Sequence, residues 1–150
     1  MKTHSRLPEP GKRIIDILES QHFSCFDTKQ EATEIRRKMM VQFKDGTPLL
    51  QKNEAGNCFF VIIQGSVIAV NDHGKILACL TSGAVIGEIS FLSGLPRTCN
   101  VIAQGDVMAL KLDRENMEQL DLFLQIEIQE QLIQVLVHRF IEKDTAQFWM

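Results

Sequence analysis

Apolar residues recur along this chain at a spacing that changes twice, and the first zone has the spacing of a helix. Pro8, Pro10 and Gly11 predict a break near the start of the chain. An apolar patch at helical spacing follows the break. It consists of Ile14, Ile15, Ile17 and Leu18. A charged stretch over residues 31–38 predicts a second helix, so we expect residues 1–40 to form an N-terminal helical segment.

The middle zone, residues 41–112, alternates short apolar runs with glycine-marked turns, which is typical of β-strands. Gly65 is expected to end one strand, and residues 104–106 are expected to form a turn between two others. The expected strands cover residues 41–46, 58–63, 67–70, 76–80, 101–103 and 107–112. Many short strands at a spacing of roughly ten residues predict a β jelly roll, also called a double-stranded β-helix, or a small β-sandwich, and we expect the jelly roll.

The third zone, residues 113–150, returns to helical spacing. Asp113 is a candidate N-cap for a short helix over residues 116–120, and a longer helix is expected over residues 122–143. Two apolar rows run along the longer helix. They are Leu122, Ile126, Ile133, Leu136 and Phe140, and beside them Ile128, Leu132 and Val135. Either one broad face packs on the core, or a second face is left for a partner.

Length and composition favour one folded domain over residues 1–150, mainly β with flanking helices. The chain has 150 residues, 45% of them hydrophobic, and its net charge of -3 argues against a nucleic-acid partner. No apolar run approaches the roughly 20 residues that span a bilayer. The N-terminus is too polar for a signal peptide. We therefore expect a cytoplasmic protein without membrane insertion.

The cysteines and histidines give no sign of a metal centre. No two of them have the spacing of a zinc ribbon, a redox pair or a histidine-ligated metal. They are Cys25, Cys58, Cys79 and Cys99, and His4, His22, His73 and His138. We expect reduced thiols, no metal, no cofactor and no catalytic residues, because no nucleophile–base pair is evident. A metalloenzyme of the cupin type would need a histidine and carboxylate cluster that the sequence lacks.

Residues 83–98 break the β pattern and hold the strongest candidate site. A short helix that begins at Glu88 or Ile89, after Gly87, would present free backbone N–H groups to an anion. Arg97 would place a guanidinium beside the same anion. This combination suits a monoanionic phosphodiester, whereas a triphosphate would call for a P-loop, which the sequence does not contain.

A carboxylate beside an anion site is explained if the ligand carries hydroxyl groups. Glu88 can accept a hydrogen bond from a ribose hydroxyl, and Gly87 lets the backbone approach the sugar closely. An anion site, a hydroxyl acceptor and a nearby apolar wall together describe a cyclic nucleotide.

The same residues form a recognisable motif. The run IGEISFL at residues 86–92, followed by LPRTC at residues 95–99, closely resembles the phosphate-binding cassette of cyclic-nucleotide-binding domains. That family includes the regulatory subunits of protein kinase A, cyclic-nucleotide-gated channels and the bacterial catabolite activator protein. Gly46, Gly56 and Gly65 lie where β turns of the family have glycine.

The resemblance implies a role for each matching residue. Glu88 would accept from the ribose 2′-hydroxyl, and Arg97 would pair with the cyclic phosphate. Backbone amides of Ile89, Ser90 and Thr98 would add phosphate contacts, and Thr98 permits cGMP without excluding cAMP. The C-terminal helix would cover the base. Its candidate residues are Leu132, Leu136 and Phe140.

Two functions remain open at this stage. The first is a stand-alone cyclic nucleotide sensor, for cAMP or cGMP, that relays binding through movement of its C-terminal helix. Because no helix-turn-helix, channel or kinase segment is present, the output would pass through an effector protein or a homodimer. The second is a ligand-independent interaction or dimerisation module that uses the same helix and keeps a vestigial nucleotide pocket.

Overall fold

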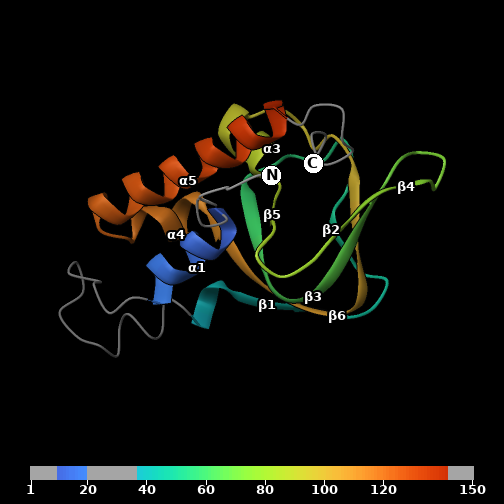
Figure 1. The fold of residues 1–150 in the computed structure, drawn as a ribbon, viewed down its shortest axis with the longest axis horizontal. Coiled ribbons are helices and arrows are strands. Elements are labelled where there is room, and N and C mark those ends of the chain that lie inside the picture. Colours follow the sequence, from blue (N-terminus) through green and yellow to red (C-terminus); the bar gives the residue numbers. More distant parts are fainter. Residues whose placement is uncertain (1–9, 20–36, 142–150) are drawn as a thin grey trace, which may run out of the picture.

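The computed structural model describes residues 10–19 and 37–141, in which a β roll lies beside a group of helices (Figure 1). Every strand pairing in the sheet is antiparallel. The strands are β1 (Met40–Phe43), β2 (Pro48–Leu50), β3 (Cys58–Val70), β4 (Ile76–Leu80), β5 (Val85–Ile86) and β6 (Asn100–Asp113). The hydrogen-bonded order is β1-β6-β3-β4, with β2 on β6 and β5 on β3.

The long strands β3 and β6 pair from Cys58 opposite Asp113 to Val70 opposite Asn100, with register shifts in between. The prediction that Gly65 ends a strand is therefore wrong, and so is the predicted turn at residues 104–106. Both positions are irregularities inside continuous strands, where bulges let a long strand bend.

Gly65 shows why the bend needs glycine. Its φ is +98°, and a Cβ there would lie 2.5 Å from the backbone oxygen of Asp106. The two bent strands can approach this closely only where one of them lacks a side chain. Sequence patterns did not predict β2 or β5, because runs of three and two residues are too short to show a period.

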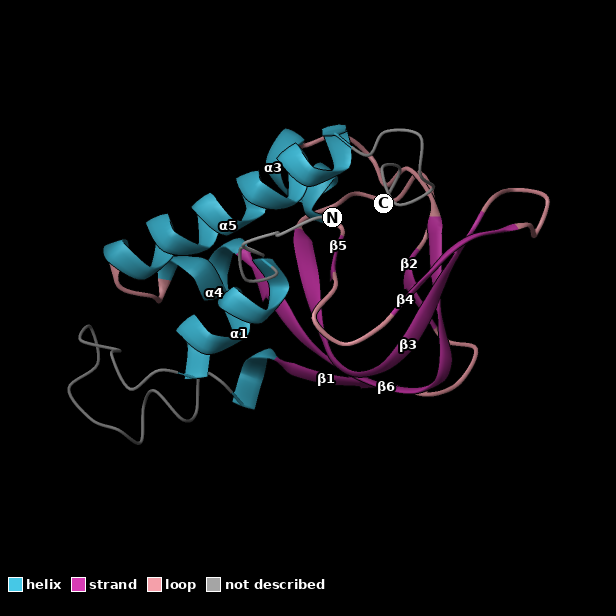
Figure 2. Ribbon diagram, viewed as in Figure 1, coloured by secondary structure: helices cyan, strands magenta, loops and turns pink. Residues whose placement is uncertain are grey.

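The helices gather on one side of the roll (Figure 2). The helices with both ends in the described ranges are α1 (Pro10–Glu19), α3 (Glu88–Ser93), α4 (Arg114–Glu118) and α5 (Leu122–Ile141). Residues 37–39, directly before β1, are also helical. Contacts join α1 to α5 and to β3. The predicted helical patch is confirmed, but the predicted break at Pro10 and Gly11 is wrong, because both residues lie in the first turn of α1. Proline is tolerated there, since its missing N–H would have no helical partner.

Some predictions fall outside the described part of the chain. Pro8, most of the helix expected over residues 31–38, and residues 142–143 of the long helix belong to this group. The short helix begins slightly earlier than expected, directly after Asp113, whose side chain accepts from Asn116 N at 2.7 Å. Asp113 is therefore confirmed as an N-cap.

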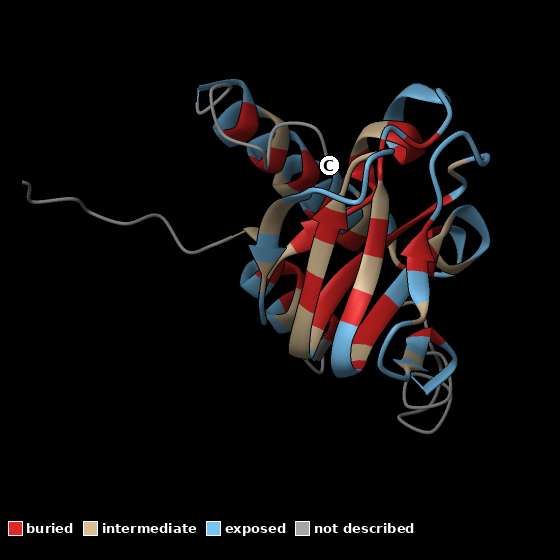
Figure 3. Cartoon of the chain, turned by 90° about the vertical axis from the view of Figure 1, so that its right-hand side faces the viewer, coloured by how far each residue is buried: buried red, intermediate tan, exposed pale blue. Residues whose placement is uncertain are grey.

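Two apolar clusters hold the described residues together. One lies inside the roll and includes Phe60, Ile62, Val67 and Val101. The other joins the helices to the outer side of the roll, where Ile14 and Leu18 of α1 meet residues of β3, β6 and α5. Figure 3 shows that burial is concentrated along the strands and falls at the turns. The second cluster fixes the helices against the segment that holds the candidate site.

The apolar residues of α5 divide between two faces. Leu124, Ile128, Leu132 and Val135 are buried. The row through Leu122, Ile126, Ile133 and Phe140 is exposed instead, together with Phe123, Val137 and Ile141. Of the two explanations that the sequence left open, the structure favours a helix with one face on the core and a second apolar face in solvent.

Candidate functional site

The candidate site is organised around α3, a helix of six residues. Gly87 and Gly94 flank α3 and both adopt the left-handed conformation, with φ of +85° and +75°. Gly94 N donates to the Ser90 carbonyl at 2.9 Å and closes the helix. The short helix expected after Gly87 is thus present, with glycines at the two positions where the backbone reverses.

Arg97 lies against the start of α3 and is 5% exposed. Its Nη1 donates to the Gly87 carbonyl at 2.7 Å, and its Nη2 donates to the Cys58 carbonyl at 2.7 Å. A Cβ at Gly87 would lie 2.6 Å from Nη1, so glycine makes room for the guanidinium. Within the described residues no ion pair to a carboxylate is seen for Arg97. A buried cation that is held by neutral carbonyls is well suited to attract an anion.

The loop before β3 helps to hold Arg97 in place. Arg97 N donates to the Glu54 carbonyl at 2.9 Å, and the Arg97 carbonyl accepts from Asn53 N at 2.9 Å. A Cβ at Gly56 would lie 2.1 Å from Ser90 Cβ, so this loop also packs directly on α3. The loop of residues 53–56 therefore meets α3 and Arg97, which lie more than 30 residues later in the sequence.

Glu88 opens α3 and has no exposed surface. Its Oε1 accepts a hydrogen bond from Arg139 Nη1, and Arg139 Nη2 donates to the Val85 carbonyl. Arg139 comes from the buried side of α5 and is 8% exposed. Burial lowers the pKa of the Arg139 guanidinium to about 10, so the group remains charged at neutral pH. Glu88 Oε2 is buried and has no hydrogen-bond partner among the described residues.

Arg139 was not among the residues predicted from the sequence, although the sequence contains a signal for it. Arg139 follows Val135 by four residues and so continues the buried row that runs through Ile128 and Leu132. Arginine is almost never fully buried unless it is paired. A charge within the core row of a helix therefore indicates a buried acceptor, and here the acceptor is Glu88.

A third arginine reaches α3 from α4. Arg114 Nη2 donates to the Phe91 carbonyl at 2.7 Å, and its guanidinium lies 4.8 Å from the centre of the Phe91 ring. Phe91 in turn packs edge-on against Phe59 of β3, with 5.0 Å between ring centres. α3 is thus tied to the roll and to both following helices.

The structure brings most of the predicted ligand-binding residues together. Gly87, Glu88, Ile89 and Ser90 form one continuous segment, Arg97 contacts that segment, and exposed Thr98 follows Arg97. The candidates for the base cover lie differently from one another. Leu132 is buried in the helical cluster, Leu136 is half-buried, and Phe140 is 68% exposed. The individual roles of these residues stay predictions.

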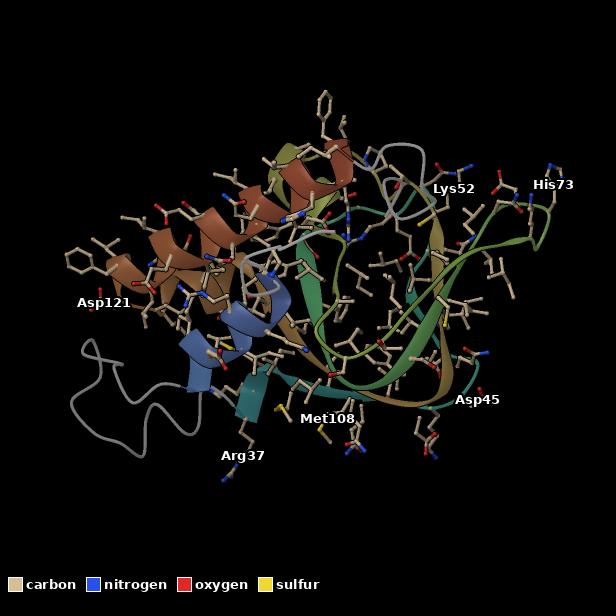
Figure 4. The ribbon with its side chains drawn as sticks, in the orientation of Figure 1. Arg37, Asp45, Lys52, His73, Met108 and Asp121 are labelled. Carbon is tan, nitrogen blue, oxygen red and sulfur yellow. The ribbon has the colours of Figure 1, made fainter. Side chains whose placement is uncertain are left out.

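The described ranges give no support for a metal centre or for a membrane-spanning helix. Residues 10–19 and 37–141 hold no cluster of three or more metal-ligating side chains. Lys52 and Asp72 form an exposed ion pair at 2.8 Å, which lowers the Asp72 pKa. In Figure 4 Lys52 lies on the side of the roll and Asp121 at the opposite, helical end of the molecule. None of the described helices combines the length and the hydropathy that a bilayer crossing requires. α3 and its arginines therefore remain the best candidate.

Known proteins are similar to this chain in sequence and in fold. The family model described as "Cyclic nucleotide-binding domain" matches residues 40–121. Cyclic nucleotide-gated channel beta-3 of Canis lupus familiaris is 33% identical over 103 residues, which are 65% of this chain and 13% of the channel. The match thus spans a small part of that relative.

Solved structures with a similar fold include the following two. A cyclic nucleotide-binding domain from Methylobacillus flagellatus KT gives a TM-score of 0.66 at 23% identity, covering 88% of this chain and 79% of its own. The regulatory domain of Toxoplasma gondii PKA, co-crystallised with cAMP, gives a TM-score of 0.53 at 21% identity, covering 83% and 50%. These likenesses confirm the expected fold, an antiparallel β roll with flanking helices. Because the family model covers more than half of the sequence, the chain belongs to the cyclic nucleotide-binding domain family.

Proposed function

We propose that this domain binds cAMP or cGMP beside α3 and acts as a regulatory sensor without catalytic activity of its own. The observation that carries the proposal is the burial of Arg97 and Glu88 within one family cassette. Arg97 keeps a buried positive charge held by carbonyls, and Glu88 keeps a buried carboxylate oxygen without a partner among the described residues. A cyclic phosphate and a ribose hydroxyl would satisfy these two groups.

Further contacts follow from the same proposal. Backbone amides of Ile89, Ser90 and Thr98 would donate to the phosphate, and Gly87 would let the sugar approach the backbone. The base would lie under α5, with Leu132, Leu136 or Phe140 as its cover. The cAMP in the Toxoplasma gondii structure supports a nucleotide of this class as the ligand.

The output of the sensor would pass through α5. Arg139 connects α5 directly to Glu88, so a ligand that contacts Glu88 acts on the group that anchors the helix. A relay requires different ligand affinities in two states of the protein, typically worth about 1–3 kcal/mol. The helix would then signal to an effector protein or to a second copy of the chain, in the cytoplasm.

Isothermal titration with cAMP and then cGMP tests the proposal. The protein is first unfolded and refolded, which removes nucleotide carried over from the expression host. We expect binding that Arg97→Ala weakens by about 2–5 kcal/mol, because the phosphate would lose its buried charged partner. Arg37→Ala is the matched control, since Arg37 is exposed and points away from the roll (Figure 4). Equal affinity in the Arg97 variant and the parent would refute the site.

A second function is favoured by the exposed face of α5. Phe123, Ile126 and Ile133 are 77%, 52% and 52% exposed, which is unusual for large apolar residues on one helix. The domain would then work as an interaction or dimerisation module, with or without nucleotide. Light scattering of the refolded protein would show a dimer that Ile126→Glu together with Ile133→Glu dissolves. A parent protein that stays monomeric would rule out the homodimer.

A further inference from the structure

We propose that Arg139 is a positioning residue for ribose recognition: it holds Glu88 through Oε1 so that Oε2 is left for a ligand hydroxyl group. This inference rests on the proposed function and adds a residue of α5 to the nucleotide site. It joins positions 88 and 139, which are separated by 51 residues in the sequence. The observation behind it is that the two oxygens of one buried carboxylate have different surroundings.

The two carboxylate oxygens of Glu88 have different contacts. Oε1 accepts from Arg139, whereas Oε2 is buried and has no hydrogen-bond partner in the described ranges. The guanidinium is itself fixed, because its second nitrogen donates to the Val85 carbonyl, which lies three residues before Glu88. Arg139 thus binds residues 85–88 at two points and so fixes the orientation of Glu88 Oε2.

The energetics favour an arrangement in which Arg139 and the ribose hydroxyl bind the Glu88 carboxylate at the same time over one in which the hydroxyl displaces Arg139. A ribose hydroxyl is a neutral donor and cannot replace the charge of a guanidinium. Displacing Arg139 would leave a buried cation without its partner, which is strongly unfavourable. An ionised carboxylate can accept at both oxygens, so a hydroxyl on Oε2 leaves the ion pair intact.

Access of the ligand is compatible with this arrangement. Glu88 has no exposed surface, so a ligand reaches Oε2 only after segments that cover α3 move apart. Arg139 can stay with Glu88 during this movement, because the Val85 carbonyl that it also binds belongs to the same segment. The hydroxyl would then meet a carboxylate that is already charged and oriented.

The test combines one substitution with one change in the ligand. Binding of cAMP and of 2′-deoxy-cAMP, and of the corresponding guanine nucleotides, is measured for the parent, Arg139→Gln and His138→Gln. In the parent, loss of the 2′-hydroxyl should weaken binding by about tenfold or more, as expected for a hydrogen bond to a charged group. In Arg139→Gln this penalty should fall clearly below that of the parent, because a buried carboxylate without its cation favours the protonated form, which makes only a neutral hydrogen bond to the hydroxyl. His138→Gln, at an exposed neighbouring position, should keep the full penalty.

Each outcome has a definite meaning. A parent that binds no cyclic nucleotide refutes the proposed function itself. A parent that binds, with the same 2′-deoxy penalty in Arg139→Gln, overturns the positioning role and leaves the function standing. Tighter binding of cAMP by Arg139→Gln also overturns it, because Arg139 would then compete with the ligand. Arg139→Lys replaces the Gln variant if the latter does not fold. Its penalty should fall less than in the Gln variant but still below that of the parent, because an ammonium keeps Glu88 charged but cannot bind both Oε1 and the Val85 carbonyl as the planar guanidinium does.

Discussion

At the scale of single residues, three arginines from different parts of the chain converge on α3. Arg97 binds the carbonyl before the helix, Arg139 binds its first side chain, and Arg114 binds the carbonyl of its fourth residue. Arg97 and Arg139 are at least nine-tenths buried, and such burial is tolerated because each has strong acceptors. The short helix is therefore held mainly by tertiary contacts, as a helix of six residues must be.

The two glycines that flank α3 predict a difference between matched variants. Both have positive φ, so alanine at either position costs about 1–2 kcal/mol of backbone strain. At Gly94 a Cβ meets nothing within 4 Å, whereas at Gly87 it would lie 2.6 Å from Arg97 Nη1. Gly87→Ala should lower the free energy of unfolding more than Gly94→Ala, and it alone should weaken nucleotide binding. Urea unfolding and titration would check this, and equal losses would mean that the Gly87 contact is unimportant.

The thiols predict a pattern of chemical reactivity. Burial raises the pKa of Cys58 and of Cys99, whereas Cys79 is exposed. Because the thiolate is the reactive form, an alkylating reagent at pH 8 should modify Cys79 long before the two buried thiols. The raised pKa values also stabilise the fold below the unfolded thiol pKa of about 8.5, and this stability should be lost as the pH rises above it. Peptide mass mapping would check the order of labelling, and rapid labelling of native Cys58 would contradict it.

At the scale of elements, the sequence predicted those parts of the fold that have a long enough period. The patch on α1, the β character of residues 58–70 and the long α5 were all visible as repeating apolar positions. The short strands β2 and β5 were not, and the bulge at Gly65 was mistaken for an end. A glycine marks a turn and a bulge alike, and the choice between them depends on the partner strand.

Prediction of the candidate site from the sequence was limited in the same way, to features that a local pattern can show. Gly87, Glu88 and Arg97 were predicted because they lie within one short motif, but Arg139 required knowledge of which face of α5 is buried. Two apolar rows with similarly regular helical spacing run along α5. Tertiary packing selected the row that contains Leu132, and the sequence pattern did not.

The division of α5 into two faces makes a direct prediction for neighbouring residues. Leu132 is 0% exposed and Ile133 is 52% exposed. Leu132→Ala should lower the free energy of unfolding by about 2–5 kcal/mol, because it removes buried methyl groups and leaves a cavity. Ile133→Ala, on the exposed face, should change it by no more than about 0.5 kcal/mol in a monomer. Chemical denaturation would measure both, and a large loss for Ile133→Ala would place that face in an interface.

At the scale of the whole molecule, the two candidate functions predict different behaviour of the melting temperature. A ligand that binds only the folded state at 100 times its Kd adds about 2.7 kcal/mol to the free energy of unfolding. In a protein of this size each kcal/mol raises Tm by about 2–4 °C, so saturation should raise Tm by about 5–10 °C. A ligand-independent dimer would instead show a Tm that rises with protein concentration and ignores nucleotide.

A melting series in both variables therefore separates the sensor from the interaction module. For the sensor, cAMP or cGMP should raise Tm in the parent and in Arg37→Ala but not in Arg97→Ala, because only Arg97 is placed to meet the phosphate. For the module, Ile126→Glu together with Ile133→Glu should remove the dependence on protein concentration, because both side chains lie on the exposed face of α5. The Tm of one protein can also depend on both nucleotide and protein concentration. If the rise in Tm caused by nucleotide then changed with protein concentration, ligand binding and association through α5 would be thermodynamically coupled.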